Sequence, residues 1–421
     1  MFKKTTLNNG LRVLTIPMPN TKTVTVLILV GTGSKYETKE INGISHFLEH
    51  MFFKGTAKRP SPAKIVEELD RVGGEYNAFT SKEHTGYYAK VDFRHLDLAL
   101  DWISDIFLNS KLDEQEIEKE KSVILEEINM YLDTPMHYVG HLWEELLYNG
   151  QPAGWPVWGN KDVILGLKRD KFLEYLKAQY TSQNALICIA GNLEESSVLK
   201  KIEAYFKNIR QGLRQEKLEL KEEQSKPDLL VHHKKTDQTH LCLGVRAYDI
   251  FHPDRYAISI LGIILGGFMS SRLFQEVREK LGLAYYIRTS AEQSTDSGYL
   301  VTQAGVANQK VEEAVKAIVN EYKKIKKEKV SDEELMRAKE HIKGNMLLNL
   351  ETSDEMASFF AGQEILKKEI LTPEQVFEKI DKITIDDIQR VAQDIFKPEK
   401  LNLALIGPFK NKDKFRDLLK I

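Results

Sequence analysis

The sequence has few cysteines and no long apolar run, and each shortage excludes a class of protein. Cys188 and Cys242 are the only two cysteines, too few for a disulfide framework or a cysteine-rich metal site. The longest apolar runs, residues 24–30 and 257–268, fall short of the roughly 20 residues that a membrane helix needs. Residues 1–6 lack the pattern of a signal peptide. We therefore expect a soluble cytoplasmic protein that does not bind membranes.

Neither sign of charge is in excess. The chain has 60 Lys and Arg against 62 Asp and Glu, a net charge of −2, which gives no reason to expect nucleic acid as a partner. The composition, 42% hydrophobic and 29% charged, is that of an ordinary globular protein. Because single cores stop growing near about 250–300 residues, a chain of 421 residues predicts two or three domains.

One pattern occurs twice, about half the chain length apart. Residues 180–191 read YTSQNALICIAG and residues 396–407 read FKPEKLNLALIG, each an aromatic residue, a polar turn and an apolar strand that ends in glycine. A repeat of this length indicates two similar domains and not a solenoid. The charged stretch 210–228 is typical of a linker. We predict an N-terminal domain over residues 1–212, a linker over 213–228 and a C-terminal domain over 229–421.

Each half combines strand and helix patterns. Residues 11–16 and 23–30 are rich in β-branched side chains and predict two strands. Ser61 followed by Pro62 is typical of a helix start. Residues 113–132 and 310–327 carry apolar residues at helical spacing. With few alternating βαβ units, this arrangement predicts the α+β class, with a sheet packed against helices in each half.

The residues with the clearest chemistry are His46, Glu49 and His50, in the order H-x-x-E-H. On a helix, positions four apart lie one above the other, so both imidazoles can reach one metal ion. Glu49 projects from the same side and can reach a water on that ion. This order is the inverse of the more common H-E-x-x-H zinc motif.

A catalytic zinc ion usually has three protein ligands, so a third ligand is needed. Residues 116–128 form an acidic stretch with helical periodicity. Glu120 and Glu127 are two turns apart on one face of that helix. The neighbouring Glu126 points about 100° away from Glu127, so one of this adjacent pair faces the site. The spacing alone does not choose between them.

The stretch HFLEHMFFKGT, residues 46–56, resembles the signature of the pitrilysin/insulysin family of metallopeptidases with the inverted zinc motif. The resemblance continues in the expected order through residues 73–91, 118–128, 180–192 and 270–286. The chain length fits the short branch of the family, which includes mitochondrial processing peptidase and bacterial peptidases. The resemblance covers nearly the whole chain and implies two homologous domains.

Carried over by position, the resemblance implies that His46, His50 and Glu127 bind one zinc ion. Glu49 then corresponds to the general base of the family. Glu120 corresponds to a second glutamate that assists without binding zinc. The chemistry agrees, because zinc can lower the pKa of a bound water to about 7 and a carboxylate can accept its proton.

The resemblance also implies substrate-binding residues in both halves. In the first half an extended peptide would add beside the strand that contains Asn77, Ala78 and Phe79. In the second half Arg278 and Tyr285 match a pair that holds the substrate backbone and polarises the scissile carbonyl. Residues 266–273, which correspond to the zinc helix, contain no metal ligand, so the second copy is not expected to be a second active site.

These observations predict a zinc endopeptidase that cleaves peptides or unfolded segments in an enclosed chamber. The resemblance implies a clamshell of two chains, and we expect a homodimer because this chain carries both the zinc residues and the Arg278/Tyr285 pair. One alternative is a non-catalytic structural or substrate-recognition subunit of the same fold. A purely structural zinc site is less favoured, because such sites usually have four protein ligands and no use for Glu49.

Overall fold

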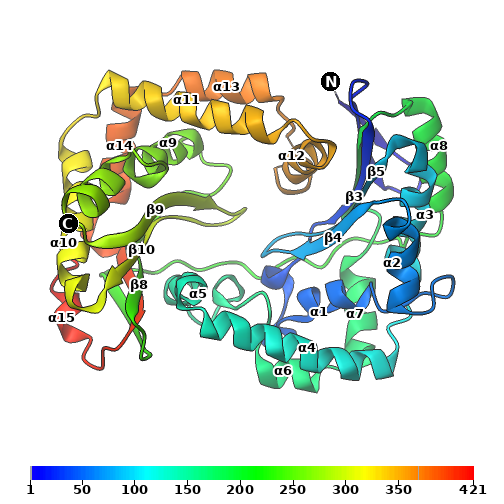
Figure 1. Cartoon of the computed structure of the whole chain (residues 1–421), viewed down its shortest axis with the longest axis horizontal. Helices are drawn as coiled ribbons and strands as arrows, with labels where there is room; N and C mark the ends of the chain where they lie inside the picture. Colours follow the sequence, from blue (N-terminus) through cyan, green and yellow to red (C-terminus); the bar gives the residue numbers. More distant parts are fainter. Residues whose placement is uncertain (1, 368) are drawn as a thin grey trace. The chain divides into compact units, whose positions relative to one another are not determined.

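The computed structural model describes residues 2–367 and 369–421, which form two compact units, each built on one β-sheet (Figure 1). Unit 1 contains Met1–Asn129, Trp155–Leu218 and Leu347–Thr372, and unit 2 contains Met130–Gly154, Glu219–Met346 and Pro373–Ile421. The predicted α+β class with two related units is confirmed. The predicted domains, residues 1–212 and 229–421, are contiguous, whereas each packed unit includes a segment from the other half.

Unit 1 contains a six-stranded sheet in the order β1-β2-β6-β3-β5-β4. Its strands are β1 (Lys3–Thr6), β2 (Arg12–Pro17), β3 (Thr23–Val30), β4 (Glu75–Thr80), β5 (Thr85–Asp92) and β6 (Ala185–Gly191). The β-branched run that predicted β3 forms a central strand that is buried along nearly its whole length. At the edge of the sheet, β4 pairs with β5 over Glu75–Thr80.

Helices cover both faces of this sheet. The helices of unit 1 are α1 (Ile44–Met51), α2 (Pro62–Asp70), α3 (Leu96–Asn109), α4 (Glu114–Asp133), α6 (Lys161–Gly166), α7 (Arg169–Gln179), α8 (Glu195–Tyr205) and α12 (Ser353–Leu366). Figure 1 shows α2, α3 and α8 on one side of the sheet and α12 on the other. As the sequence predicts, Ser61 caps α2, because its side chain accepts a hydrogen bond from Lys64 N and Pro62 occupies the first helical position.

Unit 2 repeats this topology. Its five-stranded sheet has the order β7-β11-β8-β10-β9, with strands β7 (Asp228–His233), β8 (Gln238–Arg246), β9 (Ala284–Gln293), β10 (Gly298–Ala307) and β11 (Leu401–Gly407). In each sheet the strand from the repeated pattern, β6 or β11, runs parallel to one neighbour and antiparallel to the other. The two halves therefore share one strand order, with β1 as an addition in unit 1.

The helices of unit 2 also lie on both faces of its sheet. They are α5 (Pro135–Leu147), α9 (Arg255–Gly266), α10 (Val311–Lys327), α11 (Asp332–Asn349), α13 (Pro373–Asp381), α14 (Ile385–Ile395) and α15 (Asp413–Arg416). In this unit α9 packs on β9, and α5 packs on β11 and β8. The first half of the sequence thus supplies α5 to the second sheet.

The second half in turn supplies α12 to the first sheet. Phe360, Ala357 and Ala361 of α12 are fully buried against apolar side chains of β2, β3 and β6. Polar contacts fix both ends of the helix: Ser353 bonds to Thr25, and Glu364 pairs with Arg12. The apolar face of the first sheet is therefore completed by a segment that lies far away in the sequence.

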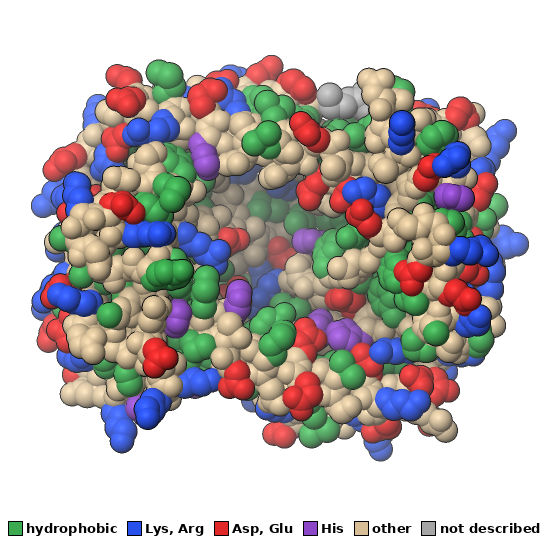
Figure 2. All heavy atoms as spheres, in the orientation of Figure 1, with side chains coloured by type: hydrophobic (Ala, Val, Ile, Leu, Met, Phe, Trp, Pro, Cys, Tyr) green, Lys and Arg blue, Asp and Glu red, His purple; other side chains and the backbone are tan. Residues whose placement is uncertain are grey.

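Among the described helices, none is both long enough and apolar enough to cross a membrane. On the face drawn in Figure 2, acidic and basic side chains are interspersed, in agreement with the net charge of −2.

Candidate metal centre

The centre is built on α1, a short helix with one apolar and one polar face. Phe47, Leu48 and Met51 are fully buried in the core of unit 1. The helical spacing places His46, Glu49 and His50 on the opposite, partly exposed face. The two imidazole rings lie edge to face with centroids 4.7 Å apart. The local sequence therefore aligns the two histidines before any tertiary contact is considered.

The third member of the cluster comes from α4. Glu127 Oε1 lies 3.5 Å from His46 Nε2, and Glu127 Oε2 lies 3.6 Å from His50 Nε2. The three candidate ligand atoms all lie within 4.8 Å of one another. Glu126, which the spacing left as an alternative, is exposed on the outer side of α4.

These distances fit a zinc ion. In a tetrahedral site with bonds of about 2.0–2.1 Å, neighbouring ligand atoms are about 3.3 Å apart. The separations of 3.5 and 3.6 Å, which involve the two different oxygens of Glu127, are close to this value, and the three candidate ligand atoms lie within 4.8 Å of one another. Two imidazoles and one carboxylate are also the donor set of catalytic zinc sites that keep one position for water or substrate.

A second glutamate of α4 orients one of the histidines. Glu120 Oε1 lies 2.8 Å from His50 Nδ1, and Lys54 Nζ lies 2.5 Å from Glu120 Oε2. Burial opposes ionisation of Glu120, but the hydrogen bonds from His50 and Lys54 prevail and lower its pKa. A carboxylate on Nδ1 leaves Nε2 of His50 directed towards Glu127, as is usual for a metal-binding imidazole.

The other histidine is held differently. The side chain of His46 is only 12% exposed, and its Nδ1 atom is buried without a hydrogen-bond partner among the described residues. Burial disfavours the imidazolium form, yet the nearby Glu127 carboxylate outweighs this effect and raises the pKa of His46. The acidic surroundings therefore attract positive charge to this position.

The position of Glu49 is fixed by the last residue of β4. Thr80 Oγ1 donates a hydrogen bond of 2.6 Å to Glu49 Oε2. This bond holds one carboxylate oxygen and leaves Oε1 as the oxygen that can exchange a proton with a neighbouring molecule. The arrangement suits a general base beside a metal-bound water.

The predicted peptide-binding residues Asn77, Ala78 and Phe79 lie on β4, the edge strand nearest to α1. Asn77 is exposed, and its side chain accepts a hydrogen bond from the backbone N–H of Ala78. An edge strand can pair with an added peptide strand through backbone groups, with few demands on sequence. The predicted residues therefore lie where such a strand could be added.

Arg278 and Tyr285 belong to unit 2. Arg278 lies in a π-helical segment, Phe274–Lys280, with its guanidinium carbon 4.7 Å from the centre of the Phe274 ring. Tyr285 lies on β9 and is 75% exposed. Both side chains are accessible within their unit, and π-helical segments occur often at functional sites. Their predicted contact with substrate stays a prediction.

By the family resemblance, the segment of unit 2 that corresponds to α1 covers residues 266–273. Residues 266–273 contain no metal ligand, and Phe268 packs on the ring of His341. In the described part of the chain, the His46, His50 and Glu127 group is the only cluster that could hold a metal.

Two site residues, Thr80 and Lys54, were not predicted. Both lie in stretches that resemble the family. However, Thr80 of β4 contacts Glu49 of α1, and Lys54 contacts Glu120 of α4, so each partner lies on another element. A polar residue at the end of a strand and a lysine after a helix form no sequence pattern that would mark them as site residues. Only the tertiary structure shows that they touch the centre.

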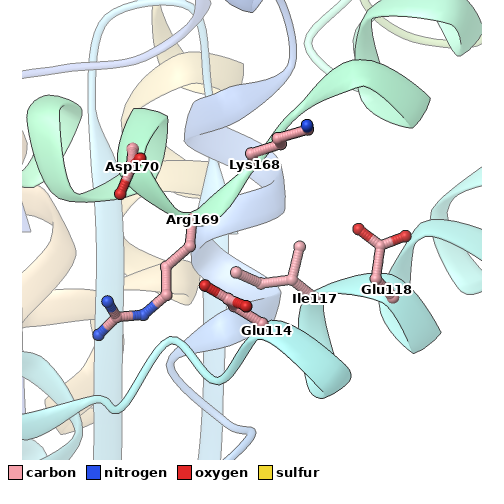
Figure 3. Close-up of a pocket in the computed structure, with 6 residues that line it drawn as sticks. All are labelled: Glu114, Ile117, Glu118, Lys168, Arg169 and Asp170. Atoms are coloured by element: carbon pink, nitrogen blue, oxygen red, sulfur yellow. The ribbon is translucent and has the colours of Figure 1, made fainter.

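A separate hollow in unit 1, with a volume of about 320 Å³, is shown in Figure 3. It is lined by Glu114, Ile117, Glu118, Lys168, Arg169 and Asp170. The guanidinium of Arg169 bonds to the backbone carbonyl oxygens of Leu112 and Lys111. These bonds join the start of α7 to the chain before α4.

Two related α+β units with an H-x-x-E-H helix in the first are the arrangement that the family resemblance implied. A family model described as insulinase, peptidase family M16, matches residues 12–161. A second model, described as the inactive domain of peptidase M16, matches residues 166–342. With the relatives below, these matches show that the chain belongs to peptidase family M16, and the predicted family is confirmed.

Two curated relatives match almost the whole chain. "Uncharacterized zinc protease YmxG" of Bacillus subtilis is 37% identical over 98% of this chain and 99% of its own length. An "uncharacterized zinc protease" of Rickettsia felis is 36% identical over 97% of this chain and 98% of its own. At the level of the family these names support zinc as the metal.

Solved structures agree with the fold. The crystal structure of a protease from Helicobacter pylori has a TM-score of 0.91 and 26% identity, covering 97% of this chain and 99% of that one. A peptidase M16 inactive domain from Pseudomonas fluorescens has a TM-score of 0.90 over 97% of this chain. Its 17% identity supports the fold alone.

Proposed function

We propose that this chain is a zinc-dependent endopeptidase. The observation that carries the proposal is the cluster of His46, His50 and Glu127, with the Glu49 carboxylate on the same helix face. The zinc-protease family supports the metal and the reaction class. The assignment of individual roles to these side chains is our own.

In this proposal His46, His50 and Glu127 hold the ion. A zinc ion in this position would act as a Lewis acid and lower the pKa of a bound water to about 7. Glu49 would accept at Oε1 the proton of a water that attacks the peptide carbonyl carbon, while Thr80 holds Oε2. The same carboxyl group then returns the proton to the amine that leaves when the peptide bond breaks. Glu120 assists by orienting His50.

The proposed substrates are short peptides or unfolded segments. A peptide would bind as an extended strand beside Asn77, Ala78 and Phe79 of the edge strand β4. Arg278 and Tyr285 are proposed to hold the substrate backbone, on the basis of the resemblance. Rapid cleavage of a compact folded protein, with no preference for peptides, would contradict this part of the proposal.

Hydrolysis of a quenched fluorescent peptide library by the wild type and Glu49→Gln tests the proposed reaction. We expect the wild type to cleave, a chelator to stop cleavage, and Glu49→Gln to retain its metal but lose at least about 100-fold in rate. Glu126→Gln is the matched control, since Glu126 is exposed on the outer side of α4. An active Glu49→Gln enzyme would refute the role of Glu49.

A non-catalytic subunit of the same fold is the second candidate, because the model that matches residues 166–342 describes an inactive domain. That match does not include the residues of the metal centre, which lie before residue 130. A wild-type protein that binds zinc but cleaves nothing in a broad library would favour this candidate.

We further propose that the active form is a homodimer, because one chain carries both the metal cluster and the Arg278/Tyr285 pair. Sedimentation of the active protein tests this proposal. A dimer that retains its activity is the expected result, and a stable, fully active monomer would contradict it.

A further inference from the structure

The helix that carries the metal cluster begins without a cap of its own. Gly43 occupies the N-cap position of α1 with φ of 96°, and no side chain of that residue can accept a hydrogen bond. The first N–H groups of a helix have no partner within the helix, so an acceptor must come from elsewhere. A side chain at Gly43 is also excluded by space, because a Cβ atom there would lie 2.7 Å from Gly159 Cα.

Glu37 supplies the missing acceptors. Its Oε2 accepts hydrogen bonds from Gly43 N at 2.7 Å and Asn42 Nδ2 at 2.9 Å, and its Oε1 accepts one from Ser45 N at 2.9 Å. The residue is 1% exposed. Burial raises the pKa of this carboxyl group, and the hydrogen bonds from Gly43, Ser45 and Asn42 oppose that change. A carboxylate at a helix start also interacts favourably with the helix dipole.

A second buried contact holds the same turn from the other side. Ser45 Oγ lies 2.7 Å from the hydroxyl of Tyr175 on α7, and that hydroxyl lies 2.7 Å from Thr32 Oγ1. Ser45 directly precedes His46. The first turn of α1 is therefore fixed through both the backbone and the side chain of the residue next to a member of the cluster.

We propose that Glu37 is a positioning residue for the metal centre. By fixing the first turn of α1, it sets the directions in which His46 and His50 meet Glu127. The inference rests on the proposed function for the metal itself, but the anchoring of α1 is a property of the protein alone. Any loosening of this turn rotates both imidazoles relative to Glu127, which lies on another helix.

Glu37→Gln tests this role with little change in shape. Its amide oxygen can still accept at one position, but its NH₂ group would face the backbone N–H of either Gly43 or Ser45, so half of the cap is lost while the volume is kept. We expect zinc affinity, measured by competition with a chromophoric chelator, to fall about 10- to 100-fold. The absorption spectrum of the Co²⁺-substituted protein should change. In the metal-free protein the amides of Gly43 and Ser45 should exchange at least about tenfold faster.

Glu364→Gln is the matched control. Glu364 is an equally buried carboxylate of unit 1, but it pairs with Arg12 and Lys4 at the far side of the sheet and does not contact α1. This variant should lose thermal stability and keep its zinc affinity and its cobalt spectrum. If Glu37→Gln behaves like Glu364→Gln in zinc affinity, in the cobalt spectrum and in the amide exchange of Gly43 and Ser45, the proposal is overturned.

The outcomes separate this inference from the proposed function. If the wild type binds no metal, the proposed function fails, and amide exchange still decides whether Glu37 anchors α1: an unchanged rate overturns the inference. If Glu37→Gln does not fold, Tyr175→Phe loosens the same turn more gently. We then expect a loss of zinc affinity of about two- to tenfold, and an unchanged affinity would overturn the inference.

Discussion

Three side chains of the proposed metal centre, His46, Glu49 and His50, are held in place by other residues of unit 1. Thr80 bonds to Glu49, Glu120 bonds to His50, and Glu37 anchors the turn that precedes His46. Such outer contacts matter because catalytic groups must be kept within a fraction of an ångström of their productive geometry.

Thr80→Val should reduce peptide hydrolysis without removing the metal. The substitution keeps the shape of the side chain but deletes the hydroxyl that donates to Glu49 Oε2. Since a hydrogen bond to a charged group contributes about 1.5–3 kcal/mol, we expect kcat to fall roughly 10- to 100-fold. Zinc content and kcat are measured on the same samples. Thr80→Ser, which keeps the hydroxyl, should restore most of the rate, and equal rates for both variants would contradict the account.

A pH-dependent contribution to stability comes from unit 2. Arg272 donates two hydrogen bonds to Glu334, which lower the pKa of this carboxyl group below its ordinary value near 4.5. Because the folded-state pKa is depressed, the pair stabilises the fold above the unfolded-state pKa, and this contribution is lost as the pH falls.

Glu334→Gln should therefore lower the melting temperature at pH 7 by roughly 2–4 °C, for a loss of about 1 kcal/mol. The difference from the wild type should shrink as the pH is lowered from about 5 to 3. Glu333→Gln, an exposed neighbour on α11, is the control. A difference that is constant with pH would show that the ion pair does not act in this way.

At the residue scale, the sequence predicted what depends on local spacing. His46, Glu49 and His50 share one helix, so their common face follows from the helical period. Glu127 and Glu126 could not be separated by spacing, and the resemblance chose the one that lies by the histidines. Thr80, Lys54 and Glu37 could not be predicted, because each meets its partner only after distant elements pack together.

At the scale of elements, the strand and helix patterns predicted most of the architecture around the centre. The β-branched run formed β3, the Ser61–Pro62 start formed α2, and residues 114–133 formed the long α4. The placement of α12 was not predicted. Apolar periodicity shows that a helix has a face to bury, but it does not show which sheet that face meets.

Phe360→Ala tests the packing of α12 on the first sheet. Phe360 is fully buried among apolar residues of β2, β3 and β6, so its truncation should cost about 3–5 kcal/mol in the unfolding free energy of unit 1. Chemical denaturation followed by amide exchange measures the loss in that unit. Phe359→Ala, at a partly buried position on the same helix, should cost clearly less. Equal losses would contradict the observed orientation of α12.

At the scale of the whole molecule, one topology occurs twice but only one copy carries the chemistry. The two sheets share the same strand order apart from β1, as the repeat in the sequence predicted. Packing residues preserve that order in both copies, whereas a metal site needs only a few particular side chains. The second copy can therefore keep its fold without the ligands.

The measurement that tests the central claim most directly is a zinc titration of the metal-free protein, with peptide hydrolysis and bound zinc followed together. The account predicts that activity rises in proportion to bound zinc and stops rising at one ion per chain, because His46, His50 and Glu127 form a single cluster among the described residues. Full hydrolysis by the metal-free protein would contradict the account. So would saturation with one zinc ion per chain and no cleavage of any peptide in the library.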